Sequence, residues 1–185
     1  MKYKLKALNF NYPNIPIQIG NLIHYGKFNS ATHTAFAWYE FTENNQEYVM
    51  VVEAANQGIV ISPYEKWWLD LQYEKGKLAI GTPIYPIDEK KVESFIKKTE
   101  GQPYAWMKLK DMAVYWFLGR TDVEDTDTAW ICSEHTCELL RIGNSKLDIV
   151  KELNLPQNDY CSPMDLQISK LIKWEQIERI TKVYS

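Results

Sequence analysis

The sequence predicts an α+β fold in which an antiparallel sheet from the first half packs against helices from the second half. The first half consists of β-branched and aromatic segments separated by Gly, Asn and Glu, which is the pattern of short strands. After residue 85, apolar residues recur at helical spacing. The chain has 185 residues, 45% of them hydrophobic, with no repeat or flexible linker, so we expect a single domain over residues 1–185.

Strands are predicted over most of the first half of the chain. The sequence from Glu43 through Asn44 to Asn45 predicts a hairpin turn, because Asn tolerates the left-handed conformation that tight turns need. In the strand that precedes this turn, both faces carry apolar residues, so we expect both faces to be covered. The predicted strands are residues 21–25, 33–41, 47–55, 58–61 and 78–85.

Helices are predicted in the second half, each from its own start and stop signals. Asp88 is an N-cap residue, and an apolar stripe follows it until Gly101. Pro103 predicts the start of a second helix that ends near Gly119. A third is predicted over residues 130–142, with a C-terminal signal at 143–144. From Pro163 onward we expect a last helix or strand, packed through Leu166, Leu171, Ile172, Trp174, Ile177 and Ile180.

Charge and composition argue against several classes of partner and location. The 24 acidic and 21 basic residues give a net charge of −3, so we expect no nucleic acid partner. The longest apolar stretch, residues 112–118, is far shorter than the roughly 20 residues of a spanning helix, so no integral membrane segment is predicted. The N-terminus lacks the features of a signal peptide, and three cysteines are too few for a disulfide scaffold. These features favour a reducing, cytoplasmic location.

Cys132 is the strongest candidate for a nucleophile, because it falls in the first turn of a predicted helix. Free N–H groups and the partial positive charge of a helix N-terminus favour the thiolate over the thiol. The alternative is that Cys132 is an ordinary buried cysteine, since free cysteines are among the most buried residues. For Cys137 and Cys161 we expect this second role.

Three histidines could act as its base. His33 begins a predicted strand, so its side chain can project from the rim of the sheet toward a helix start. His135 lies on the same helix as Cys132 and is a local rival, whereas His24 falls within a predicted strand and is expected to be structural. A base also needs a partner that fixes its tautomer, and Glu53, at the end of an apolar run, suits that role unless it is only a solvated edge residue.

The order of His33, Glu53, Tyr104 and Cys132 resembles that of the circularly permuted papain-fold proteins of the NlpC/P60 superfamily, in the YiiX-like branch. The resemblance rests on short motifs between Gly20 and Leu166: Gly-Asn-Leu-Ile at 20–23, Thr-His-Thr-Ala at 32–35, Val-Glu-Ala at 52–54, Gly-Gln-Pro-Tyr at 101–104, Cys-Ser-Glu at 132–134 and Ser-Pro-Met-Asp-Leu at 162–166. It implies a papain-like sheet or partial barrel against the nucleophile helix, with the histidine strand first in the chain.

The resemblance implies a thiol hydrolase, an amidase or peptidase, without a cofactor or metal. Cys132 would be the nucleophile, His33 the base, Glu53 its orienting group, and Tyr104 an oxyanion or substrate-binding residue. The expected substrate is a peptide, an amide or a lipid-linked amide, with cell-wall peptides as one candidate, and a bacterial or phage origin is expected. Asn21 replaces the usual Asp of the first motif. His135 after Cys-Ser-Glu also resembles the lecithin retinol acyltransferase branch, so acyl transfer is a second possibility.

Two further alternatives concern the same residues, and a third concerns aromatic residues elsewhere in the chain. Cys132, His135, Cys137 and Cys161 form the donor inventory of a structural zinc site, but positions 132 and 137 are about 140° apart around a helix. A catalytically silent member of the fold would bind a peptide or lipid instead. The aromatic residues at 67–68 and 115–117 either line an apolar substrate channel or belong to the core.

Overall fold

The computed structural model describes residues 4–12, 31–106, 108, 129–156 and 161–175. Several sequence predictions lie outside these residues: the strand at 21–25 with Asn21 and His24, most of the helix after Pro103, the apolar run 112–118 with its aromatic residues 115–117, and the tail residues Ile177 and Ile180. The described part is a mixed α+β fold, so the predicted class and the antiparallel sheet are confirmed.

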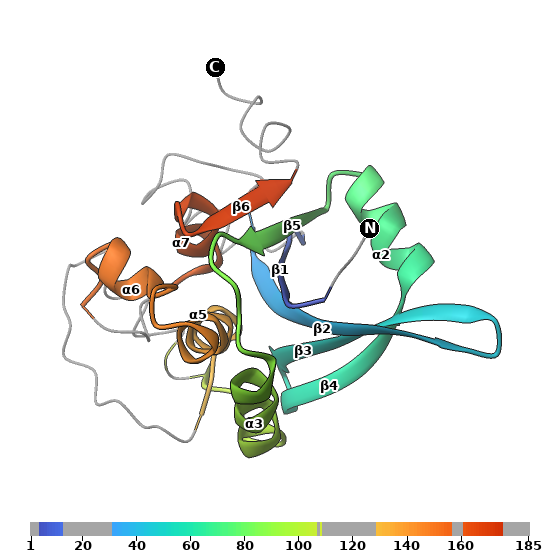
Figure 1. The fold of residues 1–185 in the computed structure, drawn as a ribbon, viewed down its shortest axis with the longest axis horizontal. Helices are drawn as coiled ribbons and strands as arrows, with labels where there is room; N and C mark the ends of the chain where they lie inside the picture. Colours follow the sequence, from blue (N-terminus) through green and yellow to red (C-terminus); the bar gives the residue numbers. More distant parts are fainter. Residues whose placement is uncertain (1–3, 13–30, 107, 109–128, 157–160, 176–185) are drawn as a thin grey trace.

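The sheet has six strands in the order β4-β3-β2-β1-β5-β6, and all neighbouring pairs are antiparallel (Figure 1). It is open, because its outer strands β4 and β6 are not paired with each other. The strands are β1 (Lys6–Phe10), β2 (His33–Glu43), β3 (Gln46–Ala55), β4 (Gly58–Glu65), β5 (Leu78–Pro83) and β6 (Ile172–Glu175).

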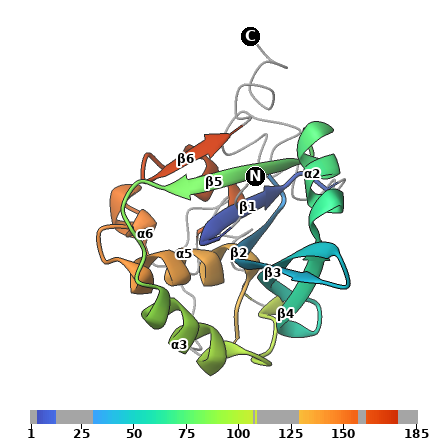
Figure 2. The same cartoon turned by 45° about the vertical axis from the view of Figure 1, so that its right-hand side comes forward.

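Helices lie on both faces of the sheet (Figures 1 and 2). One face packs against α3 and α5 through a cluster that includes Phe36, Val52, Ile96 and Leu139. The other face packs against α2 around Leu69. The described helices are α2 (Lys66–Glu74), α3 (Glu89–Thr99), α5 (Cys132–Gly143), α6 (Ile149–Glu152) and α7 (Pro163–Ile168).

The central strand β2 has two covered faces, as its alternation predicted. Phe36 belongs to the cluster under α5, whereas Ala35 and Ala37 belong to the cluster under α2. The hairpin to β3 turns at Asn44 and Asn45, both at positive φ (50° and 62°), which is the conformation that favours Asn in such turns. Because β2 ends within this hairpin, its other end, at His33, lies at the rim of the sheet.

Three described elements were missed and several boundaries move. The predictions omitted β1, which is short and begins with a lysine, α2, which buries a single residue, Leu69, and the four-residue helix α6. Strand β4 continues past residue 61 through Pro63, which an edge strand tolerates because its outer side makes no ladder bonds. Helix α5 begins at Cys132 instead of residue 130, because Trp130 pairs as a β-bridge with Tyr104.

The tail forms both of the elements that were offered as alternatives. Helix α7 is capped by Ser162, whose hydroxyl accepts from the Asp165 N–H, and β6 then pairs with β5. Leu166 and Trp174 are buried in the core.

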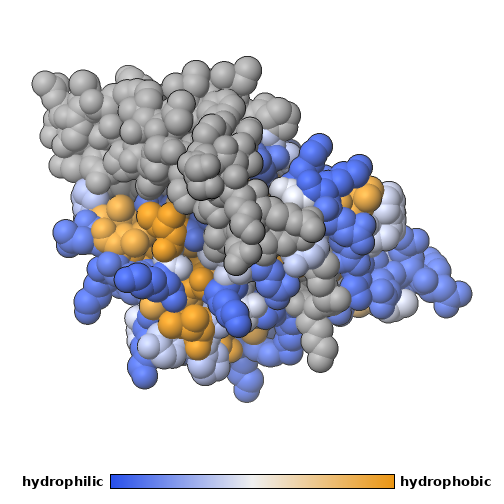
Figure 3. Space-filling view, turned by 90° about the horizontal axis from the view of Figure 1, so that it is seen from above, coloured by the Kyte–Doolittle hydropathy of each residue, from blue (hydrophilic) through white to orange (hydrophobic). Residues whose placement is uncertain are grey.

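Viewed from above, the described surface is mostly hydrophilic, with apolar side chains gathered in one region (Figure 3). No helix among the described residues is long and apolar enough to span a bilayer.

Candidate active site

Cys132 is the first residue of α5, and its neighbours fix that end of the helix. Glu134 accepts a hydrogen bond from the Ile131 N–H (3.3 Å) and forms an ion pair with Lys108 Nζ (2.9 Å). The hydroxyl of Ser133 donates to the carbonyl of Cys161 (2.6 Å). Cys132 itself is 7% exposed and is the free cysteine of the chain. Its sulfur is therefore held at a rigid helix start.

His33, the first residue of β2, lies between Cys132 and Glu53. Its Nε2 is 2.6 Å from Glu53 Oε2, and its side chain also hydrogen-bonds Cys132. Because Nε2 is occupied by the carboxylate, Nδ1 is the nitrogen that faces the sulfur. The structure thus brings His33 and Glu53, which are 20 residues apart, together with Cys132 much further along the chain.

Glu53 has a second partner that the sequence did not reveal. The hydroxyl of Tyr64 in β4 donates to Glu53 Oε1 (2.6 Å), so both carboxylate oxygens are engaged. Tyr64 lies on the same face of the sheet as Glu53, because Val60 is opposite Glu53 in the β3–β4 ladder and side chains alternate along a strand. Because the predicted strand ended at residue 61, Tyr64 was not recognised as a neighbour of Glu53.

The electrostatics of the cluster favour a thiolate–imidazolium pair. Burial alone would raise the pKa of Cys132, but the charge and hydrogen bond of His33 and the N–H groups of Thr34 and Ser133 bring that pKa below its usual value. Burial would lower the pKa of His33, but the thiolate and then the Glu53 carboxylate raise it to about 10. The His33 hydrogen bond and charge outweigh burial and lower the pKa of Glu53. All three groups therefore favour their charged forms.

Tyr104 lies close enough to Cys132 for the thiolate charge to affect its pKa. Burial, and then that charge, raise the pKa of the Tyr104 phenol, so it stays a protonated donor. Its backbone pairs with Trp130 and its ring packs on Trp106 at 4.8 Å between centroids. The loop before α5 is thus tied to Tyr104, which keeps this hydroxyl on the same side of the helix start as the nucleophile.

His135 lies away from this cluster. It is buried against Phe95 and Trp130, and its Nε2 is 2.9 Å from Thr99 Oγ1. Burial lowers the pKa of His135 to about 3, so the ring is neutral. Among the described residues its Nδ1 has no hydrogen-bond partner. The structure therefore assigns a core position to the rival histidine.

Cys137 and Cys161 correct an expectation, since they are buried but not free. The structure joins them as a disulfide between α5 and the residue before the Ser162 cap of α7. The pairing results from the packing of α7 against α5, which an odd cysteine count does not reveal. The four donors of the zinc alternative are consequently engaged elsewhere. Cys132 bonds His33, His135 bonds Thr99, and Cys137 and Cys161 bond one another.

The Tyr64 hydroxyl provides a test of its effect on Glu53. Replacing Tyr64 with phenylalanine removes one hydrogen bond to the carboxylate, which is worth about 1.5 to 3 kcal/mol for a charged acceptor. We expect the alkylation rate of Cys132 at neutral pH to fall by roughly tenfold, because Glu53 then orients His33 less firmly. Tyr48→Phe, at a half-buried position on β3 where the ring stacks on Phe41, is the matched control. An unchanged rate in Tyr64→Phe would show that His33 alone fixes Glu53.

The two histidines should respond in opposite ways to substitution. His135→Ala is expected to lower thermal stability, by about 2 to 4 kcal/mol, because it empties a packed core position. It should leave the pH profile of Cys132 alkylation unchanged, since His135 does not contact the cluster. Thermal unfolding and peptide mass spectrometry measure the two effects. A changed alkylation profile in the folded His135→Ala protein would contradict the assignment.

The fold and the site define a class: a mixed α+β protein with an open antiparallel sheet and a buried Cys–His–Glu cluster at a helix start. No family model and no curated protein matches the sequence. Among solved structures, the chain is similar to the metalloprotein YiiX from Escherichia coli O157:H7 at a TM-score of 0.55. The match is 14% identical and covers 94% of this chain and 96% of YiiX, so it extends over nearly the whole fold.

The metal of YiiX has no counterpart in the described part of this chain. No group of three or more His, Cys, Asp or Glu side chains there is arranged to hold a metal ion. The Cys132, His33 and Glu53 side chains instead bond to one another through the imidazole ring. The likeness to YiiX is therefore a likeness of fold.

Proposed function

We propose that this protein is a thiol hydrolase that cleaves an amide or ester bond through a covalent acyl-enzyme. The observation that carries the proposal is the position of His33, which hydrogen-bonds Cys132 on one side and Glu53, at 2.6 Å, on the other. This is the arrangement of a nucleophile, a base and an orienting group. The proposed reactants are peptides, amides or lipid-linked amides, as the family resemblance implies.

In this proposal the reaction begins with the thiolate of Cys132. Its sulfur attacks the substrate carbonyl carbon, and the carbonyl electron pair moves to the oxygen. Cys132 is the first helical residue, so its N–H lacks a partner within the helix and can bind that oxygen together with the Tyr104 hydroxyl. Collapse of the intermediate breaks the bond to the leaving group, which takes the proton of the His33 imidazolium.

Release of the acyl group reverses the roles. Neutral His33 takes a proton from a water molecule, whose oxygen attacks the thioester carbon. The carboxylic acid product departs, and Cys132 returns to the thiolate beside a protonated His33. Throughout, Glu53 keeps the ring oriented and compensates its positive charge.

We further propose that the fold is a permuted papain-like one. The strand that carries His33 comes first in the chain and the helix that carries Cys132 comes about a hundred residues later, as in the permuted branch of the superfamily. The fold-level likeness to YiiX supports this order. The short motifs around His33, Glu53 and Cys132 support it independently.

Hydrolysis of an activated acyl-thiol reporter tests the proposal. Wild-type protein should release the thiol with turnover, and Cys132→Ser should lose at least about 10³-fold in rate. The matched control is Cys137→Ala with Cys161→Ala, which removes both other sulfurs and should retain turnover. Binding of peptides or lipids without turnover in wild type would instead indicate a silent member of the fold. Faster release with an added amine or alcohol would indicate acyl transfer.

A further inference from the structure

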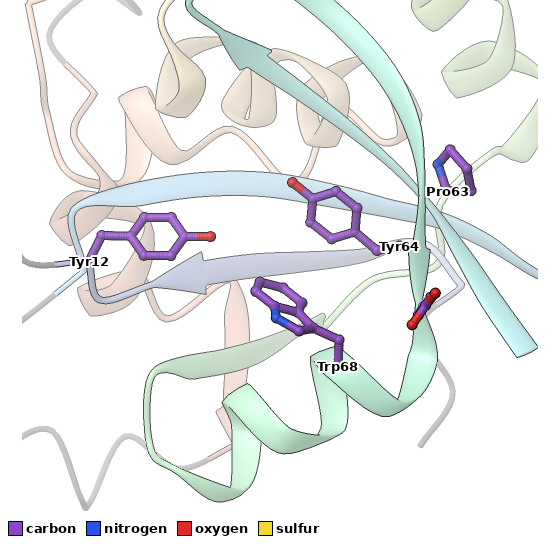
Figure 4. Close-up of a pocket in the computed structure, with 5 residues that line it drawn as sticks. Tyr12, Pro63, Tyr64 and Trp68 are labelled. Atoms are coloured by element: carbon purple, nitrogen blue, oxygen red, sulfur yellow. The ribbon is translucent and has the colours of Figure 1, made fainter.

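An open pocket of about 450 Å³ lies beside the cluster, on the face of the sheet that α2 covers. Its walls are Tyr12, Pro63, Tyr64, Glu65 and Trp68 (Figure 4). The Tyr64 and Trp68 rings meet edge to face at 5.6 Å, and the Tyr12 and Tyr64 hydroxyls point toward one another. Three aromatic rings thus surround one space.

The pocket begins one side chain away from the reacting groups. The Tyr12 ring is stacked on the His33 ring, with 6.1 Å between centroids. The Tyr64 hydroxyl is the group that holds Glu53. The pocket is thus linked to His33 through Tyr12 and to Glu53 through Tyr64.

The charges around the pocket are negative. Among the described residues that line it, Glu65 is the charged one, and its carboxylate accepts the indole N–H of Trp67. Burial and then the Glu53 charge raise the pKa of Tyr12 to about 12, which shows that the field of that carboxylate reaches the pocket. The neighbouring cation, Lys66, is turned to Glu47 at 3.2 Å. An anionic ligand would meet repulsion here.

We propose that this pocket binds an alkylated ammonium group of the substrate. This role as a substrate site rests on the proposed hydrolase function. The faces of Trp and Tyr rings carry partial negative charge and attract organic cations, and a carboxylate adds to that attraction. An apolar group would gain the same ring contacts but no benefit from Glu65. Of the two adjacent tryptophans, Trp68 lines this pocket and packs against the core under α2, whereas Trp67 is 56% exposed and is not among the described lining residues.

The test compares choline with 3,3-dimethylbutan-1-ol, which has the same shape but carbon in place of the charged nitrogen. Binding is measured by calorimetry to the full chain with Cys132→Ala. We expect choline to bind at least about tenfold more tightly than the alcohol. Trp68→Leu and Glu65→Gln should each weaken choline binding severalfold, while Trp67→Leu, the adjacent exposed tryptophan, should not.

Two results would overturn the proposal. Equal affinity for choline and the alcohol would show a pocket that selects apolar shape without charge. If the folded protein binds no choline when choline is in about 100-fold molar excess over the protein, the rings do not act as a cation site.

The failure of this proposal is distinguishable from failure of the hydrolase. Binding to Cys132→Ala needs no turnover, so choline binding with an inert wild-type protein would refute the hydrolase alone. The substrate role is tested with the thioester acetylthiocholine against its neutral carbon isostere. A kcat/KM ratio near one in an active enzyme would refute the cation site as a substrate site.

Discussion

Replacing His33 with alanine is expected to lower the turnover of an acyl-thiol reporter by about 10⁴-fold or more. The imidazole is the group that keeps Cys132 charged despite its burial, and it also supplies the proton that the leaving group needs. Without it, burial favours the neutral thiol, and neither attack nor departure is assisted. Steady-state kinetics on the purified variant measure this loss.

His135→Ala is the control for the loss of an imidazole, because that ring lies in the core and away from Cys132. It should retain turnover as long as the protein is folded. If His33→Ala kept wild-type turnover, or if only His135→Ala lost it, the base would be the wrong histidine.

Replacing Glu53 with glutamine is expected to leave the fold intact and to lower turnover by about 10² to 10⁴-fold. The amide has nearly the shape of the carboxylate but no charge, so it neither stabilises the His33 imidazolium nor fixes the same ring nitrogen as donor. Because Glu53 contributes to the raised pKa of His33, the variant should also lower that pKa. NMR titration of the His33 ring and reporter kinetics measure the two effects.

Glu47→Gln is the matched control, since Glu47 lies on the same strand but is exposed and pairs with Lys66. Its turnover should equal that of wild type. Full activity in Glu53→Gln would place Glu53 outside the reaction and leave its bond to His33 as a structural contact.

The parts of the fold that could be predicted are those with a strong local signal. The hairpin at Asn44 and Asn45 and the Asp88 cap of α3 both depend on one or two residues that prefer that conformation. The short strand β1 and the helix α2 could not be predicted in this way. Each is stabilised by packing onto the sheet, through Leu8 and Leu69, more than by its own sequence pattern.

The candidate site shows the same division. Cys132 and His33 could be chosen because each begins an element, and Glu53 because its carboxylate ends an apolar run near the end of β3. The Tyr64 hydroxyl and the Thr34 N–H could not, because their roles depend on strand register and on how α5 approaches β2. The disulfide between Cys137 and Cys161 likewise depends on the contact of α5 with α7.

The pH dependence of Cys132 alkylation by iodoacetamide reports the thiolate without any knowledge of the substrate. Peptide mass spectrometry would follow wild type and His33→Ala from pH 5 to 10. The shape of the profile is compared, since burial slows the absolute rate in both proteins. We expect a nearly flat profile through neutral pH in wild type, because His33 keeps Cys132 charged. In His33→Ala we expect a rate that rises only near or above the ordinary thiol pKa of about 8.5. Identical profiles in the two proteins, both rising only at alkaline pH, would show that Cys132 and His33 form no thiolate–imidazolium pair.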